Sequence, residues 1–204
     1  MLGTTFRRVA GELRRDVAAA HDRDPAARGV SSLQILAAWP GVQALLAHRL
    51  SHALAEHGWT GAARLLALVS RAVTNIEIHP RAQIGDGLFI DHGTGVVIGE
   101  TAEIGKGVKI YQGVTLGALS FPKDAGGQLL RGIKRHPTLR DNVVVYAGAT
   151  ILGGETIVGE GAVIGGNTWV VESVPPGEKV LFTRTSRAKQ RAILERAYGF
   201  GEGI

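Results

Sequence analysis

Residues 75–119 read NIEIHPRAQIGDGLFIDHGTGVVIGETAEIGKGVKIYQGVTLGAL. An aliphatic residue recurs there at nearly every sixth position, and the repeat continues as far as Val170. A helix would repeat at about 3.6 residues and a half-buried strand at about 2, so this period fits neither alone. It fits a parallel β-helix, in which each short strand points one aliphatic side chain inward and three hexads complete a turn. The repeat positions are Ile78, Ile84, Ile90, Ile98, Ile104, Ile110, Leu116, Leu139, Val145, Ile151, Val158, Ile164 and Val170.

The repeat slips in three places. Ile90 and Ile98 are two residues too far apart, and Ile151 and Val158 one too far. Between Leu116 and Leu139 a loop of roughly seventeen residues, about 118–135, must leave the coil, and such insertions often build a binding face. Polar clusters accompany the first and the longest slip: DHGTG at 91–95 and KRHP at 134–137. We therefore expect a functional site at these two positions.

Composition narrows the class of protein. The 204 residues carry 23 Lys+Arg against 18 Asp+Glu, a net charge of +5, which suits a phosphorylated small ligand but is too weak to indicate nucleic acid. The absence of cysteine excludes disulfides and thiolate metal sites, and a cytoplasmic location is the simplest expectation. We expect no membrane association, because no apolar run is long enough to span a bilayer.

Three regions follow along the chain, which together predict an α+β fold. Residues 1–73 show helical spacing and form an N-terminal α-helical module, with breaks expected at Asp24-Pro25 and Pro40-Gly41 and a helix start near Ser31 or Ser32. Residues 74–180 form a left-handed β-helix with the extruded loop, which Pro175-Pro176-Gly177 is expected to end. Residues 181–204 form a flexible C-terminal tail.

The hexads alone do not give a function, because coils of this kind serve several classes of enzyme. The longer motifs are more selective. Residues 75–119, with DHGTG, GETA and QGVTLG, together with KRHPTLRDNVVVYAGATILGG, VPPG and an upstream RDPA, resemble the serine O-acetyltransferase family of hexapeptide-repeat acyltransferases over most of the chain. The resemblance implies transfer of acetyl from acetyl-CoA to the hydroxyl of L-serine, in cysteine biosynthesis.

The resemblance also assigns roles to residues. His92 would be the general base, and Glu77, where many relatives have aspartate, would orient its ring. Asp24 and Asp91 would bind the substrate ammonium, and Arg135 and His136 its carboxylate. His136 could also steady the tetrahedral oxyanion. The histidines do not follow the pattern of zinc-binding hexad coils, so we expect no metal.

Acetyl-CoA would lie along a groove between coils, where small residues leave room for the pantetheine arm. The matching positions are Gly117, Ala118, Ala147 and Gly166. A G-V-P-A-R run that many relatives carry near the adenine phosphate is missing, and Lys179 is the candidate for the 3′-phosphate.

The tail and the assembly complete the expectations. The family often ends in an isoleucine that inserts into O-acetylserine sulfhydrylase, and this chain ends in Ile204. The resemblance further implies L-cysteine as a feedback inhibitor and a homotrimer, with a hexamer as second choice. Two alternatives stay open: another acceptor such as homoserine or an amino sugar, and a regulatory scaffold that mainly binds the sulfhydrylase.

Overall fold

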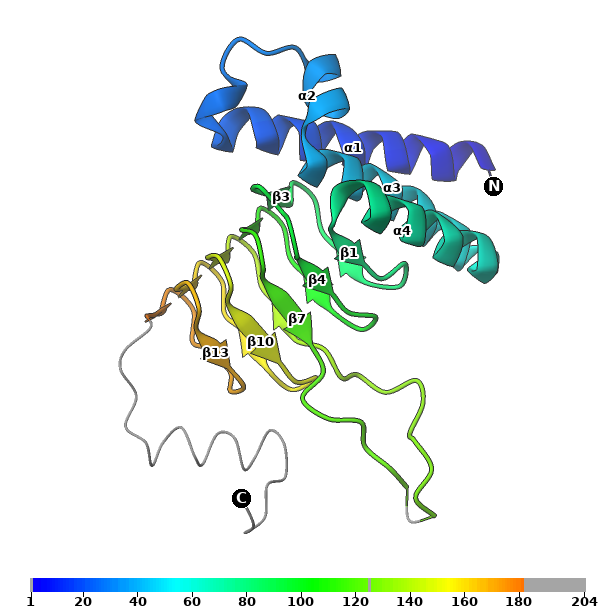
Figure 1. Cartoon of the computed structure of the whole chain (residues 1–204), viewed down its shortest axis with the longest axis vertical. Helices are drawn as coiled ribbons and strands as arrows, with labels where there is room; N and C mark the ends of the chain where they lie inside the picture. The colour runs from blue at the N-terminus through cyan, green and yellow to red at the C-terminus, as the bar shows by residue number, and fades with distance from the viewer. Residues whose placement is uncertain (1, 125, 182–204) are drawn as a thin grey trace.

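The structure is a computed structural model that describes residues 2–124 and 126–181. Helices come first along the chain and lie across one end of a coil of short strands (Figure 1). The helices are α1 (Leu2–Arg23), the 3₁₀ turn η1 (Pro25–Ala27), α2 (Ser32–Ala38), α3 (Pro40–Glu56) and α4 (Thr60–Thr74). Ile204 and the rest of the predicted tail from residue 182 lie outside the described residues.

Local sequence sets the helix ends. The Ser31 hydroxyl accepts a hydrogen bond from the Gln34 amide while the Gln34 side chain accepts from the Ser31 amide, a capping box that starts α2. Pro40 occupies the first turn of α3, where its missing N–H costs nothing. Asn75 ends α4 in the left-handed region, with φ of 56°.

Within residues 2–124 and 126–181, fourteen strands wind into three parallel sheets. Sheet A contains β1 (Glu77–Ile78), β4 (Val97–Ile98), β7 (Thr115–Gly117), β10 (Thr150–Leu152) and β13 (Trp169–Val170). Sheet B contains β2 (Gln83–Ile84), β5 (Glu103–Ile104), β8 (Thr138–Leu139) and β11 (Ile157–Val158). Sheet C contains β3 (Phe89–Ile90), β6 (Lys109–Ile110), β9 (Val144–Val145), β12 (Val163–Ile164) and β14 (Lys179–Val180).

The repeat positions form the core of this coil. In register, Ile98 pairs with both Ile78 and Leu116, and Leu116 pairs with Ile151, so aliphatic side chains stack from coil to coil. Every predicted repeat position is buried except Ile84, which is partly buried and packs against the same cluster. The helices followed by a left-handed parallel β-helix confirm the predicted fold class.

The end of the coil differs in detail from expectation. Strand β14 lies beyond Pro175-Pro176-Gly177 and pairs with β12, so this segment turns a corner in the last coil and does not end the ladder. The prolines are tolerated because they stand between strands, where no ladder N–H is needed. The loop at 118–135 leaves the end of β7 and projects from the coil, closed by an antiparallel bridge between Lys123 and Leu129 (Figure 1).

The three corners of the coil need names, because the site residues lie on them. Corner A/B joins each strand of sheet A to the next strand of sheet B, and corner C/A joins each strand of sheet C to the following strand of sheet A. Corner B/C joins each strand of sheet B to the next strand of sheet C. Neighbouring coils are closely bonded there: the Gly85 amide donates to the Ile104 carbonyl at 2.7 Å. A Cβ on Gly85 would lie 2.8 Å from the backbone of Gly105.

This close approach predicts that Gly85→Ala lowers the free energy of unfolding by about 1–3 kcal/mol, because the coils must separate to admit the methyl group. The matched change Gly61→Ala, in α4 where a Cβ would meet nothing within 4 Å, should be neutral or stabilising by up to ~1 kcal/mol. Urea denaturation of both variants measures the difference. Equal stabilities would show that coil spacing does not depend on Gly85.

Candidate active site

His92 and Asp91 occupy corner C/A of the first coil, between β3 and β4. The two extra residues of the slip form a tight turn, in which the Gly93 amide donates to the Asp91 carbonyl at 2.7 Å and the Val96 amide to the Gly93 carbonyl at 3.0 Å. His92 has φ of 58° and is exposed, so the turn presents its imidazole to solvent. The Asp91 carboxylate lies 3.4 Å from the Lys109 ammonium in the next coil.

Glu77 begins β1 and runs beside this turn. The Glu77 amide donates to the Val96 carbonyl at 2.9 Å, and the Gly95 amide donates to the Asn75 carbonyl at 2.8 Å. The Glu77 carboxylate lies 2.9 Å from the Arg71 guanidinium at the end of α4. Within the described residues no hydrogen bond joins Glu77 to His92, so the orienting role of Glu77 stays a prediction.

Arg135 and His136 occupy corner A/B, where the long loop rejoins the coil. The Arg135 guanidinium forms an ion pair with Glu100 at 2.5 Å, and Glu100 also lies 3.7 Å from Arg81. His136 is buried, and its Nδ1 accepts a hydrogen bond from the Thr101 amide at 3.1 Å. Burial first, and then the charge of Arg135, lower the pKa of His136 to about 4.

Asp24 lies in the helical module and is already well bonded. Its carboxylate caps η1 by accepting from the Ala26 amide at 2.8 Å, and it accepts from the Trp39 indole at 2.7 Å. Trp39 packs in the apolar cluster that includes Phe89 of β3, and the Lys109 ammonium lies 5.0 Å from the Phe89 ring. Asp24 and Asp91 are therefore both beside sheet C.

The predicted base and the predicted carboxylate site are far apart within one chain. Corner C/A and corner A/B are the two ends of each sheet A strand, which Figure 1 shows as a row from β1 to β13. In the third coil the strand with its flanks runs from Gly113 to Ala118, which at ~3.3 Å per residue is about 16 Å. A single serine cannot reach both corners, so the predicted groups meet only if two copies place unlike corners together.

The residues predicted to bind acetyl-CoA are also divided between corner C/A and corner A/B. Ala147 and Gly166 stack on corner C/A below His92, where the Asn167 amide donates to the Ala147 carbonyl at 2.9 Å. Gly117 and Ala118 lie on corner A/B at the start of the loop. Lys179 is exposed on β14 at the far end of sheet C.

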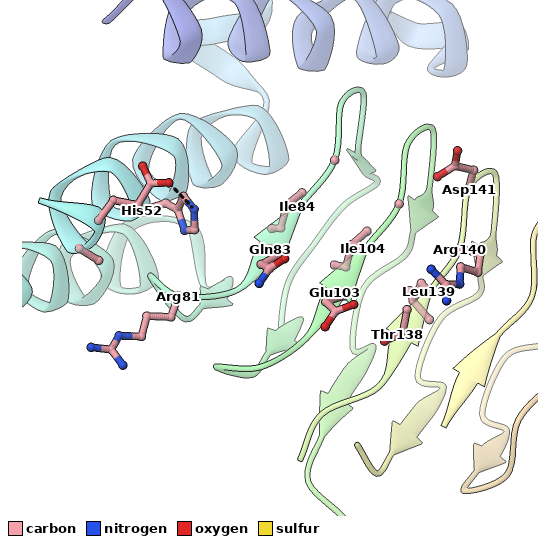
Figure 2. Close-up of a pocket in the computed structure, with 14 residues that line it drawn as sticks. His52, Arg81, Gln83, Ile84, Glu103, Ile104, Thr138, Leu139, Arg140 and Asp141 are labelled. Carbon is pink, nitrogen blue, oxygen red and sulfur yellow. Dashed lines mark ion pairs between the residues drawn. The ribbon is translucent and has the colours of Figure 1, made fainter. Parts of the chain in front are cut away.

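A groove of about 810 Å³ lies elsewhere, on the outer face of sheet B beside α3. Figure 2 shows Gln83, Glu103 and Arg140 along its floor and His52 at its helical end. None of the predicted site residues lines it. A site formed between copies of the chain would not show as a pocket in one copy, so this groove does not compete with the corners. A smaller cavity of about 280 Å³ at the loop base is lined by Arg135.

The structure adds residues that sequence reasoning missed. Thr101 bonds His136, Glu100 pairs with Arg135, and Lys109 pairs with Asp91. Thr101 and Glu100 belong to the GETA motif, which carries the family resemblance but assigns neither residue a role. Their partners lie about 35 residues downstream, beyond the extruded loop, so spacing alone gave no signal of the contact.

The described residues limit other chemistry. No group of three or more His, Asp or Glu side chains in residues 2–124 and 126–181 is arranged to hold a metal ion. Over that same part of the chain, no helix has both the length and the apolar character needed to cross a bilayer.

A left-handed coil of hexads with a histidine–aspartate corner and an arginine–histidine corner defines the class of hexapeptide-repeat acyltransferases. Comparison with known proteins narrows the class. A plasmid serine acetyltransferase of Synechococcus elongatus is 52% identical over 180 residues, covering 86% of this chain and 56% of that protein. A serine acetyltransferase of Helicobacter pylori is 51% identical over 154 residues, covering 76% of this chain and 83% of that protein.

Solved structures agree. Serine acetyltransferase of Neisseria gonorrhoeae in complex with serine superposes with a TM-score of 0.77 at 34% identity, covering 88% of this chain and 69% of that one. Serine acetyltransferase 1 of Entamoeba histolytica in complex with L-cysteine superposes with a TM-score of 0.77 at 42% identity. The match covers 85% of this chain and 63% of that one. No family model matches the chain. The chain belongs to the serine acetyltransferase family, as the motifs predicted, and it spans a little over half the length of the Synechococcus relative.

Proposed function

We propose that the protein transfers the acetyl group of acetyl-CoA to the hydroxyl of L-serine, giving O-acetyl-L-serine and CoA. The observation that carries this proposal is the histidine–aspartate turn at corner C/A, in a chain about half identical to serine acetyltransferases. His92 is exposed and stands next to an aspartate, so a substrate hydroxyl and its ammonium group can be bound side by side.

His92 acts as general base in this proposal. Its imidazole takes the proton of the serine hydroxyl as that oxygen attacks the thioester carbonyl, and the resulting imidazolium returns the proton to the departing CoA sulfur. Such proton transfer contributes typically about 10²–10⁴-fold to the rate. Glu77, beside the turn, orients the ring once its carboxylate exchanges Arg71 for His92.

Charged groups at both ends hold the small zwitterion. Asp91 and Asp24, both beside sheet C, bind the ammonium, and Arg135 with His136 binds the carboxylate. In the free chain Asp91 is paired with Lys109 and Arg135 with Glu100, so each binding group is held in place before substrate arrives. L-cysteine carries the same two charged ends and should compete with L-serine.

Small residues on the two corners suit the binding of acetyl-CoA. Ala147, Gly166, Gly117 and Ala118 present backbone and little side chain, which leaves room for an extended pantetheine arm. Lys179 is exposed on β14, the last strand of sheet C, and serves the 3′-phosphate.

The reaction is tested by following CoA release from acetyl-CoA with L-serine, L-homoserine or glucosamine. We expect release with L-serine, and a fall in kcat of about 10²–10⁴-fold for His92→Ala, because the base is removed. Glu77→Gln should lower kcat less, while Arg71→Ala should leave it unchanged. Release with another acceptor alone would reassign the substrate, and a folded oligomer without activity would favour the regulatory-scaffold alternative.

The separation of the two corners supports a homotrimer as the proposed assembly. Three identical head-to-tail contacts close a ring, and each contact brings corner C/A of one copy to corner A/B of the next. The exposed face of α4 supports such packing: Leu65, Leu68, Val69 and Val73 are all more than half exposed and form one apolar stripe.

Co-expression of His92→Ala with Arg135→Ala tests the shared site. Each variant alone should be nearly inactive, but mixed trimers should recover about a quarter of wild-type activity, because some contacts then pair two intact corners. A mixture of His92→Ala with Asp91→Ala, both on corner C/A, should recover nothing. Failure of the first mixture to recover, with trimers seen by analytical ultracentrifugation, would place the whole site in one copy. A mass of six chains would support the hexamer.

The C-terminal Ile204 is proposed to dock into O-acetylserine sulfhydrylase through its carboxylate and its aliphatic side chain. Deleting Ile204, or adding one glycine after it, should abolish binding in isothermal titration calorimetry without changing the rate of acetyl transfer. Undiminished binding by either variant would remove the tail from the interface.

A further inference from the structure

Thr101 makes an unusual number of contacts to the end of the long loop. Its hydroxyl accepts hydrogen bonds from the Arg135 amide at 2.9 Å and from the His136 amide at 3.0 Å. The same hydroxyl lies 2.9 Å from Nδ1 of His136, and the Thr101 amide donates to that Nδ1 at 3.1 Å. One residue of the second coil therefore fixes both the backbone and the ring of the carboxylate-binding pair.

These contacts decide where the proton of His136 lies. A backbone N–H is always a donor, so the Nδ1 it faces must offer a lone pair and carry no hydrogen. The neutral ring then has its hydrogen on Nε2, which makes no hydrogen bond to any described residue. Protonating Nδ1 would point two hydrogens at each other, so the cationic ring is disfavoured by geometry as well as by burial.

The surrounding charges act in the same direction. Arg135, Lys134 and His79 oppose a positive charge on His136, and Glu100 alone among the groups acting on it favours one. Glu100 is occupied by Arg135 at 2.5 Å, and Glu103 by Lys134 at 2.9 Å. The ring also lies directly over Gly99, where a Cβ would come within 2.1 Å of Nε2, so a side chain at this position would displace the ring.

We propose that Thr101 is a positioning residue that holds His136 as a neutral ring with its proton on Nε2, so that His136 donates this hydrogen to the carboxylate of the amino-acid acceptor. The proposal deepens the proposed function and rests on it for the identity of the acceptor. It assigns different tasks to the two neighbours: Arg135 supplies the positive charge, and His136 supplies a directed neutral hydrogen bond.

The arrangement itself is tested on the free full-length chain by ¹⁵N NMR of the histidine side chains, with His136 assigned by comparison with His136→Asn. We expect His136 in the Nε2–H form and still neutral at about pH 5, because its pKa is lowered to about 4. An Nδ1–H form, or an imidazolium already present at pH 6.5, would overturn the proposal whether or not the protein acetylates serine.

The positioning role is tested by kinetics with Thr101→Val, which keeps the shape but removes the hydroxyl. The KM for L-serine should rise about ten- to hundred-fold, because two amides lose their acceptor and the ring loses a partner. The KM for acetyl-CoA should not change, and Thr101→Ser should restore most of the serine affinity.

A matched control is Thr156→Val, which removes the hydroxyl that Thr156 donates to the Leu152 carbonyl at the same corner of the fourth coil. It should leave the KM for L-serine unchanged. An unaltered serine KM in a folded Thr101→Val protein would contradict the positioning role. Absence of serine acetylation in the wild type would instead refute the proposed function, and the NMR result would still decide the state of His136.

Discussion

Backbone hydrogen bonding between coils is the constraint on which the rest of this structure depends. Parallel strands must lie ~4.8 Å apart, so each hexad can shift neither along its strand nor away from its neighbour. The pairings Ile78 with Ile98 and Ile98 with Leu116 show the result: a residue is fixed in a column by its place in the repeat. Columns of aliphatic residues become the core, and residues at the slips become the two corners that carry the predicted site residues.

The helical module is joined to this coil by a buried ion pair. Arg49 of α3 lies 3.2 Å from Asp16 of α1, and its guanidinium also donates to the Gly85 carbonyl at 2.7 Å. Asp16 accepts from the Gly87 amide at 3.1 Å, so both charges are bonded to the coil backbone. Burial raises the pKa of Asp16, and the Arg49 charge opposes that rise. This contact fixes how α1 approaches the coil and thereby places Asp24 on the side of sheet C.

The sequence predicts the fold well because a period of six has few structural solutions. The sequence is a less complete guide to the functional residues, because the family resemblance assigns roles to side chains but does not give their hydrogen-bond or ion-pair partners. His92 and Asp91 could be located from the slip between Ile90 and Ile98, since extra residues in a solenoid must leave the coil. The bond between Thr101 and His136 could not, because the intervening loop has no fixed period. The pairing of Glu77 with Arg71 could not be predicted for a related reason. Packing of α4 against the coil brings Arg71 to β1, and the hexad repeat carries no information on helix packing.

The coil also explains why the predicted site residues divide between two corners. A parallel β-helix turns its side chains outward at its corners, and two corners of one copy are separated by a flat face about 16 Å wide. Groups on different corners can therefore meet only across a contact between copies. Each corner is made rigid by contacts within its own chain. Lys109 beside Asp91, and Thr101 with Glu100 beside His136 and Arg135, supply that rigidity from the neighbouring coil. The same ladder that builds the core thus holds each half of the proposed site in place.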